Sequence, residues 1–516
     1  MSWQKEVDEL RRRQALAREM GGPEKVARQR AQGKLTVRER VVILADGGSF
    51  REIGSIAGKT TYTADGELES FSPANLLVGR ARIEGRPVVF SADDFTVRGG
   101  AADGALWDKL SYAEQMANEY RLPLVRLVDG TGGGGSVKQL DKPDGRTYVP
   151  AVPGLHFAVD NMSKVPIVGL ALGPVAGLGA ARVVMSHYSV MVRGLSQLFI
   201  AGPPVVRALG ENVDKEGLGG SHMQGANGVV DDVVASEEEA FARARRFLSY
   251  LPSSVYELPA RSAPSDDPAR TDEALISVVP RDPRRSYKVR PILESVLDRG
   301  SFFEIGAGWG RSLVTGLARL DGWPVAVLAN DPNQSGGGVS SDAAQKMIRL
   351  VDLAETFRLP LVHFVDNPGF LVGERAERSA ILRHGSRAVA AVYQSSVPCC
   401  AILMRRCYGL AGAAHMNQGR LRYRYAWPSG DWGSLPIEGG LEAAYKSELE
   451  AAPDPAAKLA EIRARLDAVR SPLRTAESFW VEEIIDPRET RPLLCEFANL
   501  AAPLRSPQPS ALRYRP

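Results

Sequence analysis

The sequence is poor in cysteine, nearly balanced in charge, and free of long apolar runs. Four cysteines among 516 residues, none in C-x-x-C spacing, are too few for the disulfide framework of a small secreted protein. Lys and Arg number 64 and Asp and Glu 61, so the formal net charge is only +3, which argues against a nucleic-acid binder. No stretch reaches the roughly 18 continuous apolar residues of a membrane span.

The start of the chain, MSWQKEVDELRRRQ, is charged where a signal peptide is apolar. Together with the scarcity of cysteine, this predicts a cytoplasmic protein that binds neither nucleic acid nor membranes. The six histidines are scattered and show neither H-E-x-x-H nor Cys/His metal spacing, so no metal is expected. Cys399 and Cys400 lie in the apolar run SVPCCAILM, which favours buried thiols over a nucleophile. His384 and His415 could polarise a ligand or simply end a helix.

The chain contains short β-branched runs, such as VVFSADD and PLVRLVDG, between glycine clusters and helix-like segments. Strands that alternate with helices predict an α/β layer fold. The Pro-, Ser- and Asp-rich stretch after Leu251 is the best candidate for a linker.

The second half of the sequence repeats the first. LADGGSFREIG (44–54) returns as LDRGSFFEIG (297–306), and VGRARIEGRPVVFSADD (78–94) returns as TGLARLDGWPVAVLAND (315–331). RLPLVRLVDG (121–130) returns as RLPLVHFVDN (358–367), and VAGLGAARV (175–183) has a weaker counterpart in YGLAGAAHM (408–416). The order and spacing of these blocks predict two domains of one fold, 1–255 and 256–516, related by internal duplication.

Each half carries a Gly/Ala-rich turn between a strand-like run and a helix-like run, at 173–180 and at 408–413. Small residues permit close approach to the backbone, and the first N–H groups of a helix lack partners, so such a turn can form an oxyanion hole. Tight packing of helix on strand is the alternative. A third glycine-rich stretch, 129–136, is either a phosphate cradle or a flexible loop. Without a side-chain nucleophile or base, backbone oxyanion holes favour chemistry on an activated carbonyl such as a thioester.

The chain resembles the carboxyltransferase (β) subunit of biotin-dependent acyl-CoA carboxylases, the propionyl-CoA and methylcrotonyl-CoA carboxylase group. The resemblance is carried, in family order over nearly the full length, by GKLTVRERVVILADGGSFREIG (33–54), GPVAGLGAA (173–181), SVMVRGLSQLFIAGPPVVR (189–207), NGVVDDVVASEEEA, FVDNPGF (364–370), ILRHG (381–385), YGLAG (408–412), YAWP (425–428) and EIIDPRETR (483–491).

The resemblance implies two tandem crotonase-like domains of the ClpP/crotonase superfamily. It places acyl-CoA on the N-terminal domain (1–255) and carboxybiotin, delivered by a carrier protein, on the C-terminal domain (256–516) of a neighbouring subunit. The implied partner is a biotin carboxylase and biotin carboxyl carrier (α) subunit, and the implied assembly is a homo-hexamer, a trimer of dimers. Biotin is the cofactor, acyl-CoA the substrate, and a nitrogen of biotin the base.

The resemblance also assigns the site, residue by residue. It places one oxyanion hole at Gly177 and Leu178 and the other at Leu410 and Ala411. The substrate-binding residues that it implies around them are Ala176, Gly179, Ala180, Tyr408, Gly409, Gly412, Ala413, Pro368, Gly369 and Phe370. Leu178 and Leu410 stand where the family has small residues, but leucine still supplies an N–H group. The run Leu435-Pro436-Ile437 replaces a small, flexible segment of the family.

Two alternatives to an acyl-CoA carboxylase subunit remain open. The same fold serves the carboxyltransferase subunits of biotin-dependent decarboxylases and transcarboxylases, which run the transfer in reverse. The departures at Leu178, Leu410 and Pro436 would also suit a catalytically silent paralogue with a role in assembly.

Overall fold

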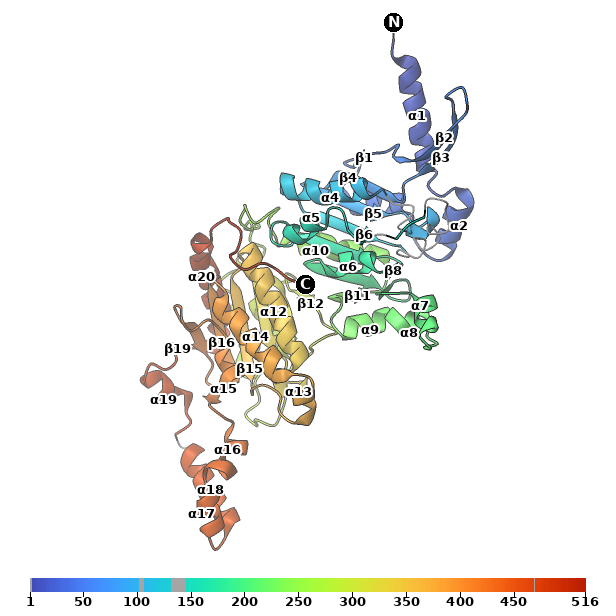
Figure 1. Cartoon of the computed structure of the whole chain (residues 1–516). Coiled ribbons are helices and arrows are strands. Elements are labelled where there is room, and N and C mark those ends of the chain that lie inside the picture. Colours follow the sequence, from blue (N-terminus) through green and yellow to red (C-terminus); the bar gives the residue numbers. More distant parts are fainter. Residues whose placement is uncertain (1, 102–105, 131–144, 148, 468) are drawn as a thin grey trace. The chain divides into compact units, whose positions relative to one another are not determined.

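The computed structural model describes residues 2–101, 106–130, 145–147, 149–467 and 469–516 (Figure 1). Contacts divide the chain into two compact units. Unit 1 comprises Met1–Glu257 together with Gln508–Pro516, and unit 2 comprises Leu258–Pro507. Both are mixed α/β structures, which confirms the predicted α/β class.

Unit 1 is built on a seven-stranded sheet. Its strands, in spatial order, are β1 (Arg51–Ile53), β4 (Leu76–Ile83), β5 (Arg86–Asp93), β6 (Leu124–Val128), β7 (Ile167–Ala171), β9 (Tyr188–Val192) and β11 (Asp232–Val234). The pairings of β4 with β1 and with β5 are antiparallel, and all the later ones are parallel. Every residue of β6, β7 and β9 is buried, as expected for parallel strands covered on both faces.

Helices and two small sheets complete unit 1. The helices are α1 (Gln4–Arg18), α2 (Pro23–Ala31), α3 (Val37–Leu44), α4 (Trp107–Tyr120), α5 (Leu155–Asn161), α6 (Leu178–Val184), α7 (Pro203–Ala208), α8 (Lys215–Gly219), α9 (Ser221–Ala226), α10 (Glu237–Ser249) and the 3-10 turn η1 (Arg98–Gly100). The small sheets pair β2 (Gly58–Tyr62) with β3 (Leu68–Pro73) and β8 (Pro174–Ala176) with β10 (Gln197–Phe199). Helix α3 begins with a capping box, in which Thr36 and Glu39 each satisfy the other's backbone N–H.

Unit 2 repeats this sheet. Its strands are β12 (Phe303–Ile305), β13 (Leu313–Leu320), β14 (Trp323–Asn330), β15 (Leu361–Asn367), β16 (Cys399–Tyr408), β17 (Tyr423–Ala426) and β19 (Glu483–Ile484), with β18 (Asp431–Gly433) paired to the end of β16. The first two pairings are again antiparallel and the rest parallel.

The helices of unit 2 are α11 (Val289–Val296), α12 (Ser341–Phe357), α13 (Glu374–Arg378), α14 (Ile381–Gln394), α15 (Gly409–Ala413), α16 (Ile437–Ala444), α17 (Lys446–Ala451), α18 (Pro455–Asp467), α19 (Pro472–Glu477) and α20 (Thr490–Ala501), with the 3-10 turns η4 (Glu273–Ile276), η5 (Ser335–Gly337), η6 (Pro487–Glu489) and η7 (Ala502–Leu504). Within the described ranges of both units, no helix combines the length and apolar character needed to cross a bilayer.

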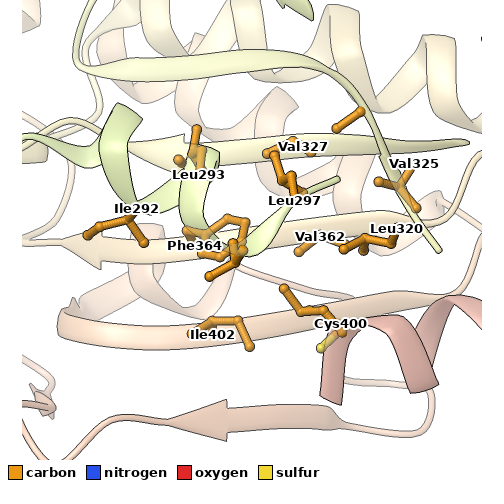
Figure 2. Close-up of a cluster of buried hydrophobic side chains, with 14 of the residues drawn as sticks. Ile292, Leu293, Leu297, Leu320, Val325, Val327, Val362, Phe364, Cys400 and Ile402 are labelled. Atoms are coloured by element: carbon orange, nitrogen blue, oxygen red, sulfur yellow. The ribbon is translucent and has the colours of Figure 1, made fainter. Parts of the chain in front are cut away.

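The main core of unit 2 lies between its sheet and helices α11 and α20. Figure 2 shows Ile292, Leu293 and Leu297, from α11 and its C-cap, facing Val362 and Phe364 of the sheet. Leu293, Leu297, Val362 and Phe364 are fully buried. Burying one such side chain stabilises the fold by about 1.5–3 kcal/mol, so this layer fixes the sheet from which the candidate site projects.

The repeated sequence blocks correspond to contacts that both units share. The Asp46 carboxylate accepts the N–H groups of the turn between β4 and β5, and the Asp298 carboxylate accepts those of the turn between β13 and β14. A side chain at Gly79 or Gly316 would meet a backbone oxygen of the neighbouring strand at 2.5 Å or 2.4 Å. The blocks therefore repeat because the same turn and the same close strand contact occur twice.

Candidate active site

The first glycine-rich turn lies between β8 and α6. Gly177, which caps the start of α6, has φ 60° and ψ −123°, a conformation that L-residues rarely adopt. A side chain at Gly173, just before β8, would meet the Asp129 carboxylate at 2.0 Å, so this position also requires glycine. The segment from Gly173 to Gly177 therefore depends on its two end glycines for different reasons, one conformational and one steric.

Two backbone N–H groups entering this turn already have partners. Ala176 donates to the Gly130 carbonyl at 3.2 Å, and Gly177 donates to the Phe199 carbonyl at 3.1 Å. Helical bonding begins with Ala181, which donates to the Gly177 carbonyl. Leu178, Gly179 and Ala180 form the first turn of α6, so their N–H groups have no acceptor within the helix. No other backbone carbonyl of the described residues accepts from these N–H groups.

The second turn lies at the same place in unit 2, between β16 and α15. In unit 1, Ala176 pairs with Phe199 of β10, and in unit 2, Tyr408 pairs with Gly433 of β18. The next residues, Gly177 and Gly409, have nearly equal φ angles of 60° and 59°. The backbone therefore matches Gly177 with Gly409 and Leu178 with Leu410, a shift of one residue from the repeat drawn on the sequence alone.

The side chains of the second turn divide between solvent and core. Leu410 is 56% exposed, whereas Ala411 and Tyr408 are only 4% and 3% exposed. The large side chain of Leu410 therefore does not fill the turn. The small side chain of Ala411 faces the interior, where a larger one would have to displace packed atoms.

Each turn is supported by an aspartate held by two cations at the end of a buried strand. Asp129, after β6, binds Lys34 at 2.6 Å and Arg40 at 2.9 Å. Arg40 also donates to the Leu172 carbonyl, just before the first turn. Asp366, in β15, binds Arg405 and Arg406, which precede the second turn. All of these side chains except that of Arg406 are at least nine-tenths buried, so removing one partner would leave an uncompensated charge.

Burial and the neighbouring carboxylates shift the pKa values of Lys34 and Arg40 in opposite directions. Burial lowers the pKa of Lys34, whereas the carboxylates of Asp129 and Glu237 outweigh the effect of burial on Arg40 and raise its pKa. Arg40 therefore stays charged and ties α3 to β6 and to α10 through Asp129 and Glu237.

The FVDNPGF segment forms the loop after β15. The Asn367 side chain accepts the Gly369 N–H at 2.9 Å, and Gly369 has φ 128°. Phe370 lies against Gly385 of α14, where an added Cβ would meet the ring at 2.8 Å. The predicted residues Pro368, Gly369 and Phe370 are partly buried. They follow Asp366, which is bonded to Arg406 just before the second turn.

Two buried histidines lie behind the second turn: His415, which the sequence analysis considered as a ligand-polarising or helix-terminal residue, and His363, which it did not single out. The Nδ1 atom of His415 lies 2.5 Å from the Gly412 carbonyl, and Nδ1 of His363 lies 3.1 Å from the His415 carbonyl. Burial lowers the pKa of His415 to about 4 and that of His363 to about 3, so both rings are neutral at physiological pH. Since a carbonyl only accepts, the proton on each ring sits on Nδ1.

We expect unit 2 to lose stability on mild acidification because of these two histidines. Their folded pKa values lie below the value of about 6.5 in an unfolded chain, so below that pH the unfolded state binds more protons and stability falls as the pH drops. At about pH 5 each histidine should lower the free energy of unfolding by roughly 2 kcal/mol relative to about pH 7. Denaturant melts across this range measure the slope. The variant His363→Gln should show a shallower slope than the wild type, and equal slopes would contradict the prediction.

Pro436 lies outside the turn and caps the start of α16. A proline beside a helix start removes an N–H group that has no helical partner in any case. The departure at 435–437 therefore leaves the backbone of the second turn intact.

Two other features of the sequence add no site to the described residues. In the described ranges, no group of three or more His, Cys, Asp or Glu side chains is placed to hold a metal ion. Of the third glycine-rich stretch, residues 131–136 lie outside the described residues.

The chain matches a known protein family over nearly its whole length. The carboxyl transferase domain family matches residues 28–513. The propionyl-CoA carboxylase carboxyltransferase subunit of Haloferax mediterranei is 31% identical over 99% of this chain and 98% of its own. The methylmalonyl-CoA decarboxylase subunit alpha of Veillonella parvula is 29% identical over 97% of each. The crystal structure of transcarboxylase 12S, a hexamer with hydrolysed methylmalonyl-CoA bound, covers 100% of this chain and 99% of its own at a TM-score of 0.87 and 29% identity.

The family match spans nearly the whole chain, and the relatives match over nearly their whole length. The family expected from the sequence is thus confirmed: the chain belongs to the carboxyl transferase family and is a carboxyltransferase.

Proposed function

We propose that this chain transfers CO₂ from carboxybiotin, carried on a partner protein, to the α (or γ) carbon of an acyl-CoA. The observation that supports this most directly is the pair of matched turns. Each carries backbone N–H groups at the start of a short helix from which no backbone carbonyl of the described residues accepts, at the same place in two similar sheets. Carboxyl transfer develops negative charge on two oxygens, that of the thioester enolate and that of the biotin ureido group, and therefore needs two such sites.

The N–H groups available for these roles are those of Leu178 and Gly179 in unit 1 and of Leu410 and Ala411 in unit 2. The first pair would stabilise the enolate, and the second the ureido oxygen as CO₂ leaves. Gly177 would contribute its backbone conformation rather than an N–H, because Phe199 already accepts that proton. Carboxybiotin supplies the CO₂, and its freed nitrogen is the base that removes the substrate proton. The chain then only has to position the two reactants and stabilise their charge.

The remaining residues would shape the two binding surfaces. Ala176 and Ala180 flank the first pair, and Ala413, with Tyr408, Gly409 and Gly412, surrounds the second. Pro368, Gly369 and Phe370 would bind substrate in the adjoining loop.

The two units would be crotonase-like domains, with acyl-CoA on the domain at 1–255 and carboxybiotin on the domain at 256–516. A hexameric assembly is supported by the hexamer of transcarboxylase 12S, and a separate biotin-carrying α subunit would be the partner. The methylmalonyl-CoA decarboxylase subunit of Veillonella parvula and transcarboxylase 12S, with hydrolysed methylmalonyl-CoA bound, support a second candidate function, in which the transfer runs from a carboxylated acyl-CoA to biotin.

Reconstitution distinguishes the two directions. The chain is combined with a biotin carboxylase and carrier subunit, ATP, labelled bicarbonate and a panel of acyl-CoAs, and acid-stable label in the product is measured. We expect biotin-dependent label in at least one acyl-CoA, blocked by avidin. If label enters none of them in a stable complex, the reverse assay, carboxylation of the carrier by methylmalonyl-CoA, is the deciding measurement. Failure of both assays would favour the silent paralogue and overturn the proposal.

A further inference from the structure

His415 lies just beyond α15, and its imidazole turns back to the helix rather than toward solvent. It is 4% exposed, and its Nδ1 lies 2.5 Å from the Gly412 carbonyl, inside the five-residue helix that follows the second turn. The backbone N–H of the same residue donates to the same carbonyl at 3.2 Å. The Cys407 thiol, on the other side of the helix in sequence, is a weak third donor at 3.5 Å. One carbonyl therefore collects three donors from both ends of the helix.

A second histidine holds the first in place. His363 of β15 lies 3.1 Å from the His415 carbonyl through its own Nδ1 and is 2% exposed. Two successive hydrogen bonds, His363 to the His415 carbonyl and His415 to the Gly412 carbonyl, thus connect a central strand of unit 2 to the helix. Among the described residues, the Nε2 atoms of both rings are buried without a hydrogen-bond partner. Leaving a buried acceptor unpaired costs about 1–3 kcal/mol, a cost that a purely apolar side chain would avoid.

Helix α15, to which these two hydrogen bonds lead, is too short to be stable without contacts from outside the helix. It has only five residues, Gly409 has φ 59°, and isolated helices of this length are unstable. Gly412 has no room for a side chain, because an added Cβ would meet the Cys407 backbone at 2.8 Å. The directions of the Leu410 and Ala411 N–H groups therefore depend on the contacts that fix the Gly412 carbonyl.

We propose that His415 is a positioning residue for carboxyl transfer, which aligns the N–H groups of Leu410 and Ala411 by donating its Nδ1 proton to the Gly412 carbonyl. This inference rests on the role given to that turn in the proposed function. The inference assigns the function of the His415 side chain to one hydrogen bond, made by Nδ1. It therefore predicts different activities for asparagine and glutamine at this position.

The test compares His415→Asn with His415→Gln. The amide nitrogen of asparagine falls at the position of Nδ1, whereas that of glutamine falls at the position of Nε2, which has no partner. We expect His415→Asn to retain most of the activity, and His415→Gln to lower kcat about tenfold or more, with KM for acyl-CoA nearly unchanged. His156→Gln, at an exposed position on α5 in unit 1, is the matched control for the change of imidazole to amide.

Hydrogen exchange gives a second readout that does not depend on turnover. In His415→Gln the amide of Ala414, which donates to the Leu410 carbonyl, should exchange about tenfold faster than in the wild type, while the amides of β14 stay protected and show that unit 2 is folded. In His415→Asn exchange at Ala414 should match the wild type. Equal exchange and equal kcat in both variants would overturn the inference. A wild-type enzyme without carboxyl transfer would overturn the proposed function, while exchange would still decide whether His415 holds the helix.

Discussion

Replacing Leu178 by proline should lower kcat for carboxyl transfer about 100- to 1,000-fold, the usual cost of losing one oxyanion donor. Leu178 is the first residue of α6, a position where proline is well tolerated because its N–H has no helical partner. The residue before it, Gly177, has ψ −123°, far from the helical values that a following proline disfavours. The substitution therefore removes one N–H group and leaves the helix in place.

Leu178→Ala is the matched control, because it removes the side chain and keeps the N–H group. We expect it to retain activity within a few-fold of the wild type. Steady-state kinetics with the reconstituted complex give kcat and KM, and thermal melts show whether unit 1 remains folded. If Leu178→Pro were fully active, or if Leu178→Ala lost as much activity as Leu178→Pro, the N–H group of Leu178 would have no part in the reaction.

The sequence predicted the α/β class and the repeat because both depend on local chemistry. Buried parallel strands require continuous apolar runs, and PLVRLVDG and PLVHFVDN are such runs. The aspartates at 46 and 298 recur because each satisfies the N–H groups of a tight turn between two strands. Features of this kind appear in sequence at fixed spacing, so a single chain can show them twice.

The hydrogen-bond partners and the backbone match of the two turns depend on contacts between segments far apart in the chain. The sequence could not show these contacts. The Gly177 N–H is occupied because β8 pairs with β10, which begins some twenty residues later. The match of Gly177 with Gly409 follows from that pairing and from its equivalent between β16 and β18. The two histidines behind the second turn are brought together only by the parallel pairing of β15 with β16. A helix-terminal histidine was one of two interpretations left open for His415, and the structure adds the partner that it bonds.

Replacing Leu410 by proline should produce a different defect from Leu178→Pro, because the two turns are assigned to different oxygens. Leu410 is the second residue of α15, and its side chain is largely exposed, so proline in this first turn removes an N–H without filling a packed space. We expect Leu410→Pro to slow the loss of CO₂ from carboxybiotin about 100- to 1,000-fold even when acyl-CoA is absent. Leu178→Pro should leave that partial reaction unchanged and impair only transfer to acyl-CoA.

The measurement is the decay of labelled carboxybiotin on the carrier protein, with and without acyl-CoA, for the wild type, both proline variants and Leu410→Ala. The alanine variant keeps the N–H and should behave as the wild type. A defect of equal size in both partial reactions for both proline variants would mean that the two turns act on one oxygen, or that they act as a structural unit. Because the N–H of Leu410 corresponds to that of Leu178 in the matched backbone, only a difference between the partial reactions can show that the two similar turns have separate roles in one transfer.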